Sequence, residues 1–413
     1  MNLEYFIAKR LIKSKGYKST TSSPIIKIAI AAIAISILMM VISVATGLGL
    51  QNKIREKIAA FSGHVILSNF DDNQSNVHTV PISINQDFYP KFKTIKGISH
   101  IQAIAHKTGI IQTPKTVEGF LLKGIGTDYD FKKLESYLTK GRLLKLSHKD
   151  SIENNEVVLS EYMANRLELG INDTFISFFP KENGKLPNRR VFKIVGLFST
   201  GFPEFDASYV FSDIRHVQRI NKWKKTEVGA FEIFLEDFKT IDTKTEEIYK
   251  EVPSTINATS IKNKYYGIFV WLNLFDTNIY IILVVMIVVA AINMIVALLV
   301  LILERTNMIG ILKALGASNW SIRKIFIYNA IYLIGKGLFW GNLIAISILF
   351  IQHYTGIIQL NPESYYVKEA PVYMTLPILL GLNLGTLLVC FIVLLIPSYY
   401  ITKIAPIKAI KFE

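Results

Sequence analysis

Residues 277–303 read TNIYIILVVMIVVAAINMIVALLVLIL, a run of 27 residues without Asp, Glu, Lys or Arg. The run lies between Asp276 and Glu304. An α-helix rises about 1.5 Å per residue, so about 20 apolar residues suffice to cross the hydrocarbon core of a bilayer. A core helix of a soluble protein needs no such length of uncharged sequence. This stretch therefore predicts a transmembrane helix.

Three further stretches have a similar length and composition. Residues 28–50 follow Lys27 without another charge, and their length favours an uncleaved signal anchor over a signal peptide. Residues 325–351 hold one charge, Lys336, and residues 372–402 hold none. The predicted order is a cytoplasmic N-terminus (1–24), a first span (25–50), an inserted domain (51–276), a second span (277–303), a cytoplasmic loop (304–324), a third span (325–351), a periplasmic loop (352–371), a fourth span (372–402) and a cytoplasmic tail (403–413).

The net charge of +14 follows membrane topology and does not suggest a nucleic-acid interface. Residues 1–50 carry a net charge of +5 and the loop 304–324 carries +3, whereas residues 352–374 carry −1. Short basic loops mark the cytoplasmic side, so we expect both termini and the 304–324 loop inside. The only cysteine, Cys390, lies within the fourth predicted span, so no disulfide is expected.

The N-terminal segment has an apolar side and a basic side. Its spacing fits an amphipathic helix lying on the inner membrane surface, and it equally fits a plain positive flank of the first span. The pattern is broken at 19–24. The apolar positions are Leu3, Phe6, Ile7 and Leu11, and the basic positions are Lys9, Arg10 and Lys13.

The inserted domain, 51–276, is long enough to bury its own core. We expect residues 51–61 to continue the first span as a helix. Strands and helices then alternate irregularly, which is typical of an α+β fold. The predicted strands are His64–Leu67, Ile110–Gln112, Phe120–Leu122, Val157–Leu159, Phe175–Phe179, Phe192–Leu197 and Phe231–Leu235, and the predicted helices are Glu161–Leu169, Asp213–Ile220 and Thr243–Glu251.

The cytoplasmic loop after the second span contains a short helix pattern. Met308, Ile311, Leu312 and Leu315 fall on one face at helical spacing. Gly316 suits the left-handed position that ends a helix, and Ser318 can cap the next one. An apolar face at this place fits a groove on another protein, and it also fits the lipid surface.

Six segments spread over nearly the whole chain carry a family resemblance. They are Phe6–Arg10, Val157–Asp173 with Ala164, Leu167, Leu169 and Gly170, Arg190–Phe198 followed by Gly201, Glu204 and Asp206, the segment IGILKALGA at 309–317, Ser364–Val367 before Pro371, and the ending Pro406, Ala409 and Glu413. In this order they resemble the FtsX/MacB-type ABC permeases, and in particular the lipoprotein-releasing permeases (LolC and LolE). The segment at 309–317 looks like their coupling helix.

This resemblance implies a MacB-like type VII ABC permease, with four transmembrane helices and an α+β periplasmic domain of two subdomains between the first and second. The family pairs with a P-loop ATPase subunit (LolD-like). This chain has no GxxxxGK[ST] segment, so we expect ATP to be bound by the partner and no cofactor here. Its histidines show no metal-ligand spacing and it has no nucleophile elbow or HExxH, so we expect no metal site and no catalytic residue. Met308 stands where many family members carry a glutamate, which makes the expected contact more apolar. The implied ATPase-coupling residues are Met308, Ile309, Ile311, Leu312, Leu315 and Gly316.

The lipoprotein-releasing branch also has a hook that grips a periplasmic lipoprotein chaperone (LolA-like). Residues 180–190 resemble the hook region but are shorter than the usual form. Two prolines and a glycine make this segment a turn-forming loop on any interpretation, and an ordinary hairpin loop remains the alternative. The candidate chaperone-binding residues are Pro180, Gly184, Lys185, Leu186 and Pro187.

Within the spans, two GxxxG pairs are candidates for close helix packing: Gly337 with Gly341, and Gly381 with Gly385. Lys336 is costly inside a membrane unless it is paired or reaches the interface. A backbone carbonyl, Asn293 or Asn383 would be its partner.

The function implied by the resemblance is ATP-driven release of lipoproteins from the bacterial inner membrane by mechanotransmission. Two ATPases would act with two permease subunits, the second being the same chain or a LolC/LolE-like paralogue. Lipoprotein acyl chains would lie between the outer halves of the first and second spans of the two subunits, with Val44, Leu48, Ile279 and Ile282 as candidates. The alternatives are an FtsX-like transducer that controls a cell-wall hydrolase and a MacB-like exporter of a small molecule or peptide. The transducers have a much smaller external domain than the one expected here, which argues against the first alternative. The exporters usually carry a fused ATPase, which we do not expect here, and this argues against the second.

Overall fold

The structure is a computed structural model that describes residues 3–13, 23–72, 79–146, 154–181 and 186–403. The chain forms two compact units. The membrane unit comprises residues 1–51, 271–359 and 369–413, and the sheet unit comprises residues 52–270 and 360–368. Each unit is described separately below. The predicted ending at Pro406, Ala409 and Glu413 and most of the 19–24 break lie outside the described residues.

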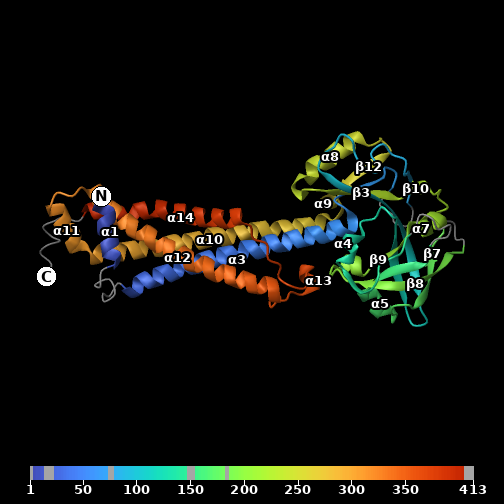
Figure 1. Ribbon diagram of the computed structural model, residues 1–413, viewed down its shortest axis with the longest axis horizontal. Helices are drawn as coiled ribbons and strands as arrows, with labels where there is room; N and C mark the ends of the chain where they lie inside the picture. The colour runs from blue at the N-terminus through green and yellow to red at the C-terminus, as the bar shows by residue number, and fades with distance from the viewer. Residues whose placement is uncertain (1–2, 14–22, 73–78, 147–153, 182–185, 404–413) are drawn as a thin grey trace. The chain divides into compact units, whose positions relative to one another are not determined.

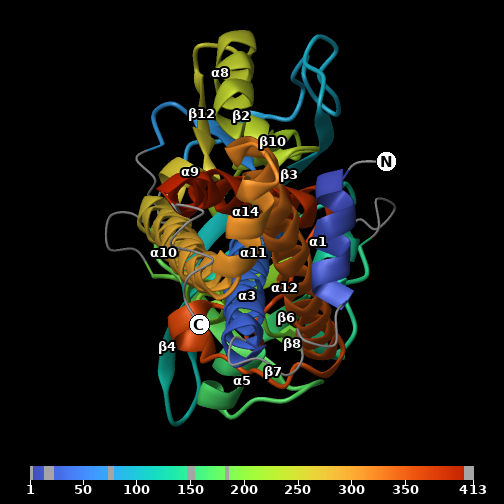
Figure 2. The ribbon, with the colours of Figure 1, turned by 90° about the vertical axis from the view of Figure 1, so that its left-hand side faces the viewer.

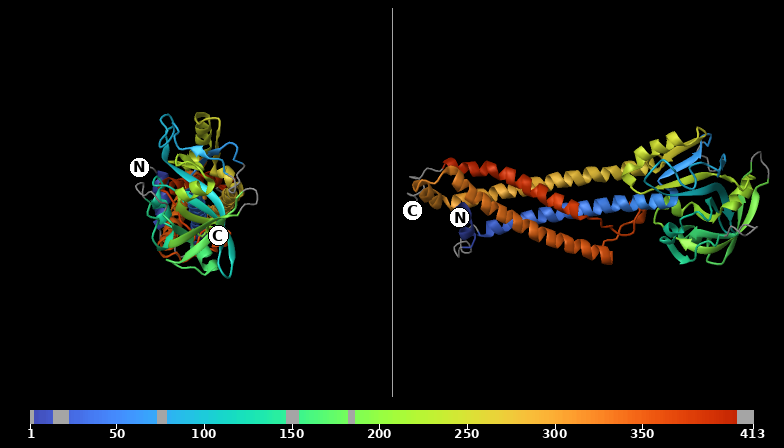
Figure 3. Two further views of the ribbon diagram at one scale, coloured as in Figure 1. Left: turned by 90° about the vertical axis from the view of Figure 1, so that its right-hand side faces the viewer. Right: turned by 45° about the horizontal axis from the view of Figure 1, so that its top comes forward.

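Among the described residues, four helices are long and apolar enough to cross a membrane, which confirms the four predicted spans (Figure 1). They are α3 (Ser23–Ser62), α10 (Tyr266–Glu304), α12 (Asn319–Thr355) and α14 (Leu376–Ser398). Helix α3 has 40 residues and therefore a length of about 60 Å, roughly twice the thickness of the hydrocarbon core. The predicted helical continuation of the first span through residue 61 is confirmed, and α3 is drawn as one uninterrupted helix in Figure 3.

The fourth span differs from its prediction at both ends. Its helix begins at Leu376 and not at residue 372, because Pro377 occupies the first turn, where its missing N–H costs nothing. It ends at Ser398, next to Pro397, and the chain continues as the 3₁₀ turn η3 (Tyr399–Lys403). The described part of the membrane unit also contains the short helices α1 (Leu3–Lys13) and α11 (Thr306–Ala314).

Close packing of α12 against α3 explains one of the two GxxxG pairs. A Cβ on Gly341 would lie 1.8 Å from Ile37 Cγ2, and one on Gly337 would lie 2.6 Å from Ile33 Cγ2. Only glycine lets the two helices approach this closely. The second pair, Gly381 and Gly385, has nothing within 4 Å of its Cβ positions, so these two glycines make no close helix contact within the described chain.

The predicted partners of Lys336 are also corrected. Asn383 exchanges side-chain hydrogen bonds with Asn342 at 2.6 and 3.1 Å, and Asn293 bonds to the carbonyl of Val289 in its own helix. The ammonium of Lys336 instead lies 4.6 Å from the centre of the Tyr332 ring, one helical turn away. The lysine is therefore held by an aromatic face on its own helix.

The sheet unit is built on a ten-stranded mixed sheet in the order β12-β1-β11-β3-β4-β9-β6-β8-β5, with β7 pairing both β3 and β8. All seven predicted strands are confirmed, and β2, β5, β9, β10 and β12 were not predicted. The pairing joins ten of the strands into this sheet, and β2 and β10 pair with each other in a separate two-stranded sheet. The strands are β1 (Val65–Asn69), β2 (Ile82–Ser83), β3 (Ile98–Gln112), β4 (Val117–Ile125), β5 (Leu138–Gly141), β6 (Glu156–Ser160), β7 (Thr174–Phe179), β8 (Asn188–Phe198), β9 (Tyr209–Asp213), β10 (Glu227–Val228), β11 (Ala230–Leu235) and β12 (Ile256–Ser260).

Short helices cover this sheet, and their caps come from strand ends. Ser160 ends β6 and accepts the Met163 N–H at 3.0 Å, while Asp213 ends β9 and accepts the Arg215 N–H at 3.0 Å. The three predicted helices are confirmed within two residues at each end. The helices are α4 (Phe131–Glu135), α5 (Glu161–Leu167), α6 (Pro203–Asp206), α7 (Ile214–Asn221), η2 (Phe238–Thr240), α8 (Ile241–Glu251), α9 (Ile261–Lys264) and α13 (Pro362–Tyr365).

Candidate functional sites

Helix α11 connects the ends of α10 and α12 and lies at the same end of the membrane unit as α1 (Figure 1). Gly316 follows α11 with φ +87°, which confirms the predicted left-handed stop. The Ser318 hydroxyl accepts the Ser321 N–H at 3.2 Å and caps α12, as predicted. The turn between α11 and α12 is therefore fixed at both of its ends.

The predicted coupling residues divide between two faces of α11. Ile309 is fully buried in the core of the membrane unit, so it is not available to a partner, and the expectation that it contacts an ATPase is corrected. Met308 and Leu312 are half-buried against the same core. Ile311 and Leu315 point outward, with 52 % and 80 % of their surface exposed. The inner face therefore anchors the helix, and the outer face offers two large apolar side chains.

Two contacts that the sequence did not reveal brace this end of the membrane unit. Lys313 donates to the carbonyl oxygens of Ile401 at 2.8 Å and Thr402 at 3.3 Å, tying α11 to η3. Helix α1 lies beside α12 (Figure 2), and Ser321 donates to the Glu4 carboxylate at 3.1 Å. The amphipathic N-terminal segment thus forms a helix that packs on α12 through Ala8, which is buried.

The candidate lipid-facing residues do not line one open surface. Val44 is buried, and Ile279 packs on α3 so tightly that a Cβ on Gly47 would lie 2.4 Å from its Cδ1. Leu48 and Ile282 are half-buried. Ile279 therefore takes part in the packing of α10 on α3 within one chain. The exposed apolar face of α10 was not singled out from the sequence and comprises Tyr280, Ile281, Val284, Val285, Val288, Ile292 and Val296.

The hook-like loop connects β7 and β8, two antiparallel strands paired from Thr174–Lys193 to Phe179–Asn188. The two strands predicted to flank the loop are therefore confirmed. Pro180 and Pro187 are exposed, and Leu186 has 85 % of its surface exposed. Gly184 and Lys185 lie outside the described residues.

An exposed apolar face adjoins this hairpin. We call it the outer sheet face and define it by Ile110, Val117, Ile176, Phe178 and Val191. The strand register places Gln112 opposite both Val117 and Ile176, and Ile176 opposite Val191. In the next row Phe178 lies opposite Ile110. Side chains at these positions share one face of four strands, and all five are exposed or half-buried. Apolar residues gathered on a solvent face are typical of an interaction surface.

A buried ion pair receives the end of α3 inside the sheet unit. Lys123 of β4 donates to Glu232 of β11 at 2.6 Å and to the carbonyl of Phe61, in the last turn of α3, at 2.6 Å. Gln102 of β3 donates to the second carboxylate oxygen at 2.8 Å. Burial lowers the pKa of Lys123, and the Glu232 carboxylate opposes this shift. The last carbonyl groups of a helix have no hydrogen-bond donor within the helix. Lys123 supplies a donor to one of them, the Phe61 carbonyl, at a buried position.

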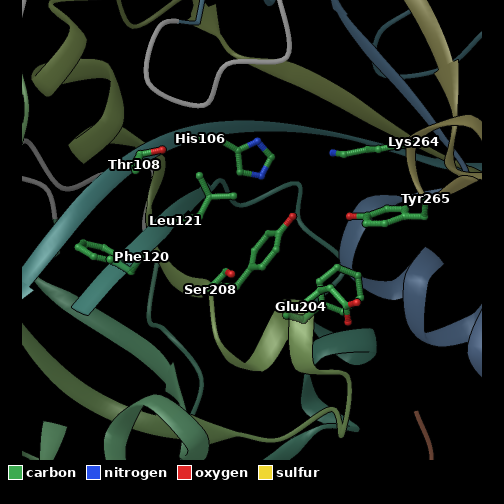
Figure 4. Close-up of a pocket in the computed structure, with 11 residues that line it drawn as sticks. His106, Thr108, Phe120, Leu121, Glu204, Ser208, Lys264 and Tyr265 are labelled. Carbon is green, nitrogen blue, oxygen red and sulfur yellow. The ribbon is translucent and has the colours of Figure 1, made fainter. Parts of the chain in front are cut away.

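The sheet unit also contains a hollow of about 420 Å³, lined in part by His106, Lys264 and Tyr265 (Figure 4). His106 and Lys264 face each other across it. Burial and the charge of Lys123 hold the pKa of His106 well below its usual value, so its ring is neutral. Tyr265 shares a 2.8 Å hydrogen bond with Ser62, the last residue of α3. The wall therefore carries both aromatic and polar groups next to the start of α10.

Comparison with known proteins adds the family. Residues 28–251 match the MacB-like periplasmic core domain, and residues 280–406 match the FtsX-like permease C-terminal region. The lipoprotein-releasing system transmembrane protein LolC of Buchnera aphidicola subsp. Schizaphis graminum is 24 % identical over 94 % of this chain and 94 % of its own. LolC of Neisseria meningitidis serogroup B is 22 % identical over the full length of both chains. LolE of Haemophilus influenzae is 20 % identical over 90 % of each chain. The chain belongs to the permease family that combines a MacB-like periplasmic core domain with an FtsX-like C-terminal region.

Proposed function

We propose that this protein is a permease subunit of an ABC transporter that releases lipoproteins from the bacterial inner membrane. A separate P-loop ATPase subunit supplies the energy, and a periplasmic chaperone receives the product for delivery to the outer membrane. The observation that carries this proposal is the similarity to LolC over 94 % of both chains, which extends through membrane and sheet units alike. Both termini and α11 lie on the cytoplasmic side in this proposal, as the basic loops predict.

The ATPase docks on the outer face of α11. Ile311 and Leu315 are its anchors, since they are the large apolar side chains that α11 leaves exposed. Met308, Leu312 and Gly316 hold the helix in place from the inner side and at its end. An apolar helix face of this kind suits a groove on a partner protein. The absence of a charged residue at Met308 makes packing, and not an ion pair, the basis of the contact.

The motion passes from α11 into the two helices that it joins, α10 and α12. Helices α3 and α10 each have residues in both units, so at these two points the chain passes between the units within a helix. A packed helix with continuous hydrogen bonding moves as a body. Closure of two ATPase subunits on two permeases would therefore displace the sheet units.

The second permease subunit and the lipoprotein acyl chains cover the exposed face of α10. The seven large apolar side chains on this face have 43–68 % of their surface exposed in the described chain. A second copy of this chain or a LolC/LolE-like paralogue would place two such faces around the acyl chains. Leu48 and Ile282 are half-buried and are the remaining candidates of the original set.

The chaperone binds the hairpin loop between β7 and β8 together with the outer sheet face. Leu186 presents an exposed apolar tip, and Val191 lies a few residues away on β8. An amphiphilic carrier protein must offer an apolar opening to receive acyl chains, and an apolar sheet face is complementary to it. Photo-cross-linking from residue 186 to a LolA-like chaperone tests this contact, with Tyr249 on α8 as an exposed control position.

The proposal is tested by depleting the protein, separating inner and outer membranes, and quantifying lipoproteins in each. Accumulation of lipoproteins in the inner membrane without an early division defect is the expected result. Normal sorting, in a strain without a second copy of the gene, contradicts lipoprotein release. A division defect would then favour the FtsX-like transducer, and loss of efflux would favour the MacB-like exporter.

A further inference from the structure

The chain passes between the two units at four points, and only two of these are within long helices. Residues 52 and 270 mark passages within α3 and α10. The other two flank the segment 360–368, between α12 and α14, which belongs to the sheet unit by its contacts. A loop between two spans would be expected to pack on the membrane unit. Its membership of the sheet unit requires a specific attachment.

Lys57 of α3 provides that attachment. Its ammonium group donates to the carbonyl oxygens of Thr200, in the turn after β8, and of Tyr366, at 2.8 Å, in the 360–368 segment. Lys57 is 6 % exposed, so these bonds are shielded from water. A charged donor shared between two buried carbonyls makes stronger hydrogen bonds than a neutral one. One side chain thus joins α3, the sheet and the loop between the third and fourth spans.

The turn that presents the Thr200 carbonyl is itself fixed. The Asp206 carboxylate accepts the Thr200 N–H at 2.9 Å, the Thr200 hydroxyl at 2.8 Å and the Gly201 N–H at 2.9 Å. Three bonds to one carboxylate hold residues 200 and 201 in a single conformation. Lys57 therefore meets a preformed acceptor.

The loop side of the contact is equally well defined. The rings of Phe202 and Tyr366 stack with centroids 4.5 Å apart and planes at 27°. Tyr366 has φ +59°, a left-handed conformation that non-glycine residues adopt only where surrounding contacts hold them. Behind it, Leu360 N–H donates to the Lys368 carbonyl at 2.9 Å and closes the segment into a hairpin.

The same hairpin continues into the membrane unit and is stiff there. Ala370 donates to Ile358 at 3.0 Å. The side chain of Gln352, in the last turn of α12, accepts the Ile358 N–H at 2.8 Å and donates to the Ala370 carbonyl at 3.1 Å. The hairpin is therefore tied to the end of α12 as well as to itself.

We propose that the 360–368 hairpin is a second mechanical linkage into the sheet unit and that Lys57 is the positioning residue that locks it. This inference rests on the proposed transport function. Movement that α11 imparts to α12 then reaches the sheet unit through the hairpin, in addition to the route through α3 and α10. Without Lys57 the hairpin detaches, and ATP hydrolysis is no longer fully converted into release of cargo.

The contact itself is tested by disulfide cross-linking in a Cys390→Ser background. A Cβ on Gly201 would lie 3.8 Å from Pro362 Cβ, a separation at which disulfides form. We expect Gly201→Cys with Pro362→Cys to cross-link under mild oxidation. Gly97→Cys with Pro362→Cys is the control: Gly97 also has a positive φ, and its Cβ would have only Lys244 within 4 Å. Lys57→Met should lower the yield of the first pair, whereas Lys53→Met, an exposed lysine one turn earlier on α3, should not.

The role in coupling is tested on the complete transporter in proteoliposomes, by measuring lipoprotein released per ATP hydrolysed. Lys57→Met should lower this ratio several-fold while ATP hydrolysis continues, and the 201–362 disulfide should restore it. Lys53→Met should match the wild type. An unchanged ratio in Lys57→Met, or no recovery with the disulfide, overturns the inference. If the wild type releases no lipoprotein, the proposed function fails. The linkage is then judged by cross-linking alone, and an equal yield of the 201–362 disulfide with and without Lys57 overturns it.

Discussion

The ammonium of Lys123 lies 2.6 Å from the carboxylate of Glu232, and both side chains are almost completely buried within the sheet unit. The pair joins strands β4 and β11, and Lys123 also holds the Phe61 carbonyl at the end of α3. An ion pair of this kind often contributes little net stability, but it leaves a buried charge if one partner is removed. Because Lys123 also bonds to the last turn of α3, the ion pair holds the end of this helix against the sheet.

Lys123→Met should destabilise the protein strongly, by about 3–5 kcal/mol, because Glu232 is then buried without a counter-charge. The double variant Lys123→Met/Glu232→Met should recover most of that loss, since two apolar side chains of similar volume replace the pair. The measurement is the free energy of unfolding of the purified protein in mild detergent. A double variant as unstable as the single one would show that the ion pair is not the cause.

Stability should fall as the pH is lowered from 6.5 towards 4.5. Burial, together with Lys133, lowers the pKa of His64 from 6.5 to about 4, and the pKa of His106 is lowered in the same direction. In this window the unfolded state binds protons that the folded state does not, so stability is complete above pH 6.5 and is lost as the pH falls. His64 Nδ1 accepts the Leu235 N–H at 2.9 Å, and Asn offers an acceptor without titrating.

Thermal unfolding midpoints at several pH values test this expectation. His64→Asn should show a smaller loss between pH 6.5 and 4.5 than the wild type. Equal slopes for the two proteins would contradict the assignment of His64 as a buried neutral ring.

Gly341→Ala should destabilise the membrane unit, whereas Gly385→Ala should not. The new methyl group at 341 would overlap Ile37 and the Ala34 carbonyl, at 1.8 and 2.6 Å, and forcing α12 away from α3 costs about 1–3 kcal/mol. The Gly385 site is open, so its change should stay within about 0.5 kcal/mol. Unfolding midpoints in detergent compare the two. A larger effect at 385 would mean that the α12–α3 contact is wrong.

Leu315→Asp and Ile311→Ser should each weaken binding of the ATPase subunit by about 10-fold or more, which is the usual loss when a central apolar anchor is removed. Both side chains are exposed, so the fold should be unaffected. Tyr249→Asp, at an exposed residue of α8, is the control. Co-purification and titration of the ATPase measure the effect. Full binding by both variants would contradict docking on the outer face of α11.

The spans and most strands could be predicted because each depends on a local pattern. An uncharged run such as 277–303 has one physical interpretation in a chain of this composition. The hairpin 174–198 was visible from two apolar runs around prolines and a glycine. Short strands such as β9 (Tyr209–Asp213) escaped notice, because they are stabilised by their neighbours in the sheet rather than by their own sequence.

The sites were only partly predictable, because side-chain direction and long-range partners are set by tertiary packing. The period of α11 identified its apolar residues but not that Ile309 faces the chain's own core. The two GxxxG pairs are alike in sequence, yet only Gly337 and Gly341 meet another helix of the described chain. Lys57 and Lys123 resembled ordinary lysines, since their partners at 366 and 232 are distant in sequence.

The central claim is that this permease, with its ATPase, extracts lipoproteins from a membrane. The most direct measurement is reconstitution of the complete transporter in proteoliposomes with a labelled lipoprotein and a LolA-like chaperone outside. We predict ATP-dependent transfer of the lipoprotein to the chaperone, which Leu315→Asp abolishes while the permease remains folded. Transfer that does not require ATP, or no transfer despite ATP hydrolysis by the assembled complex, would contradict the account.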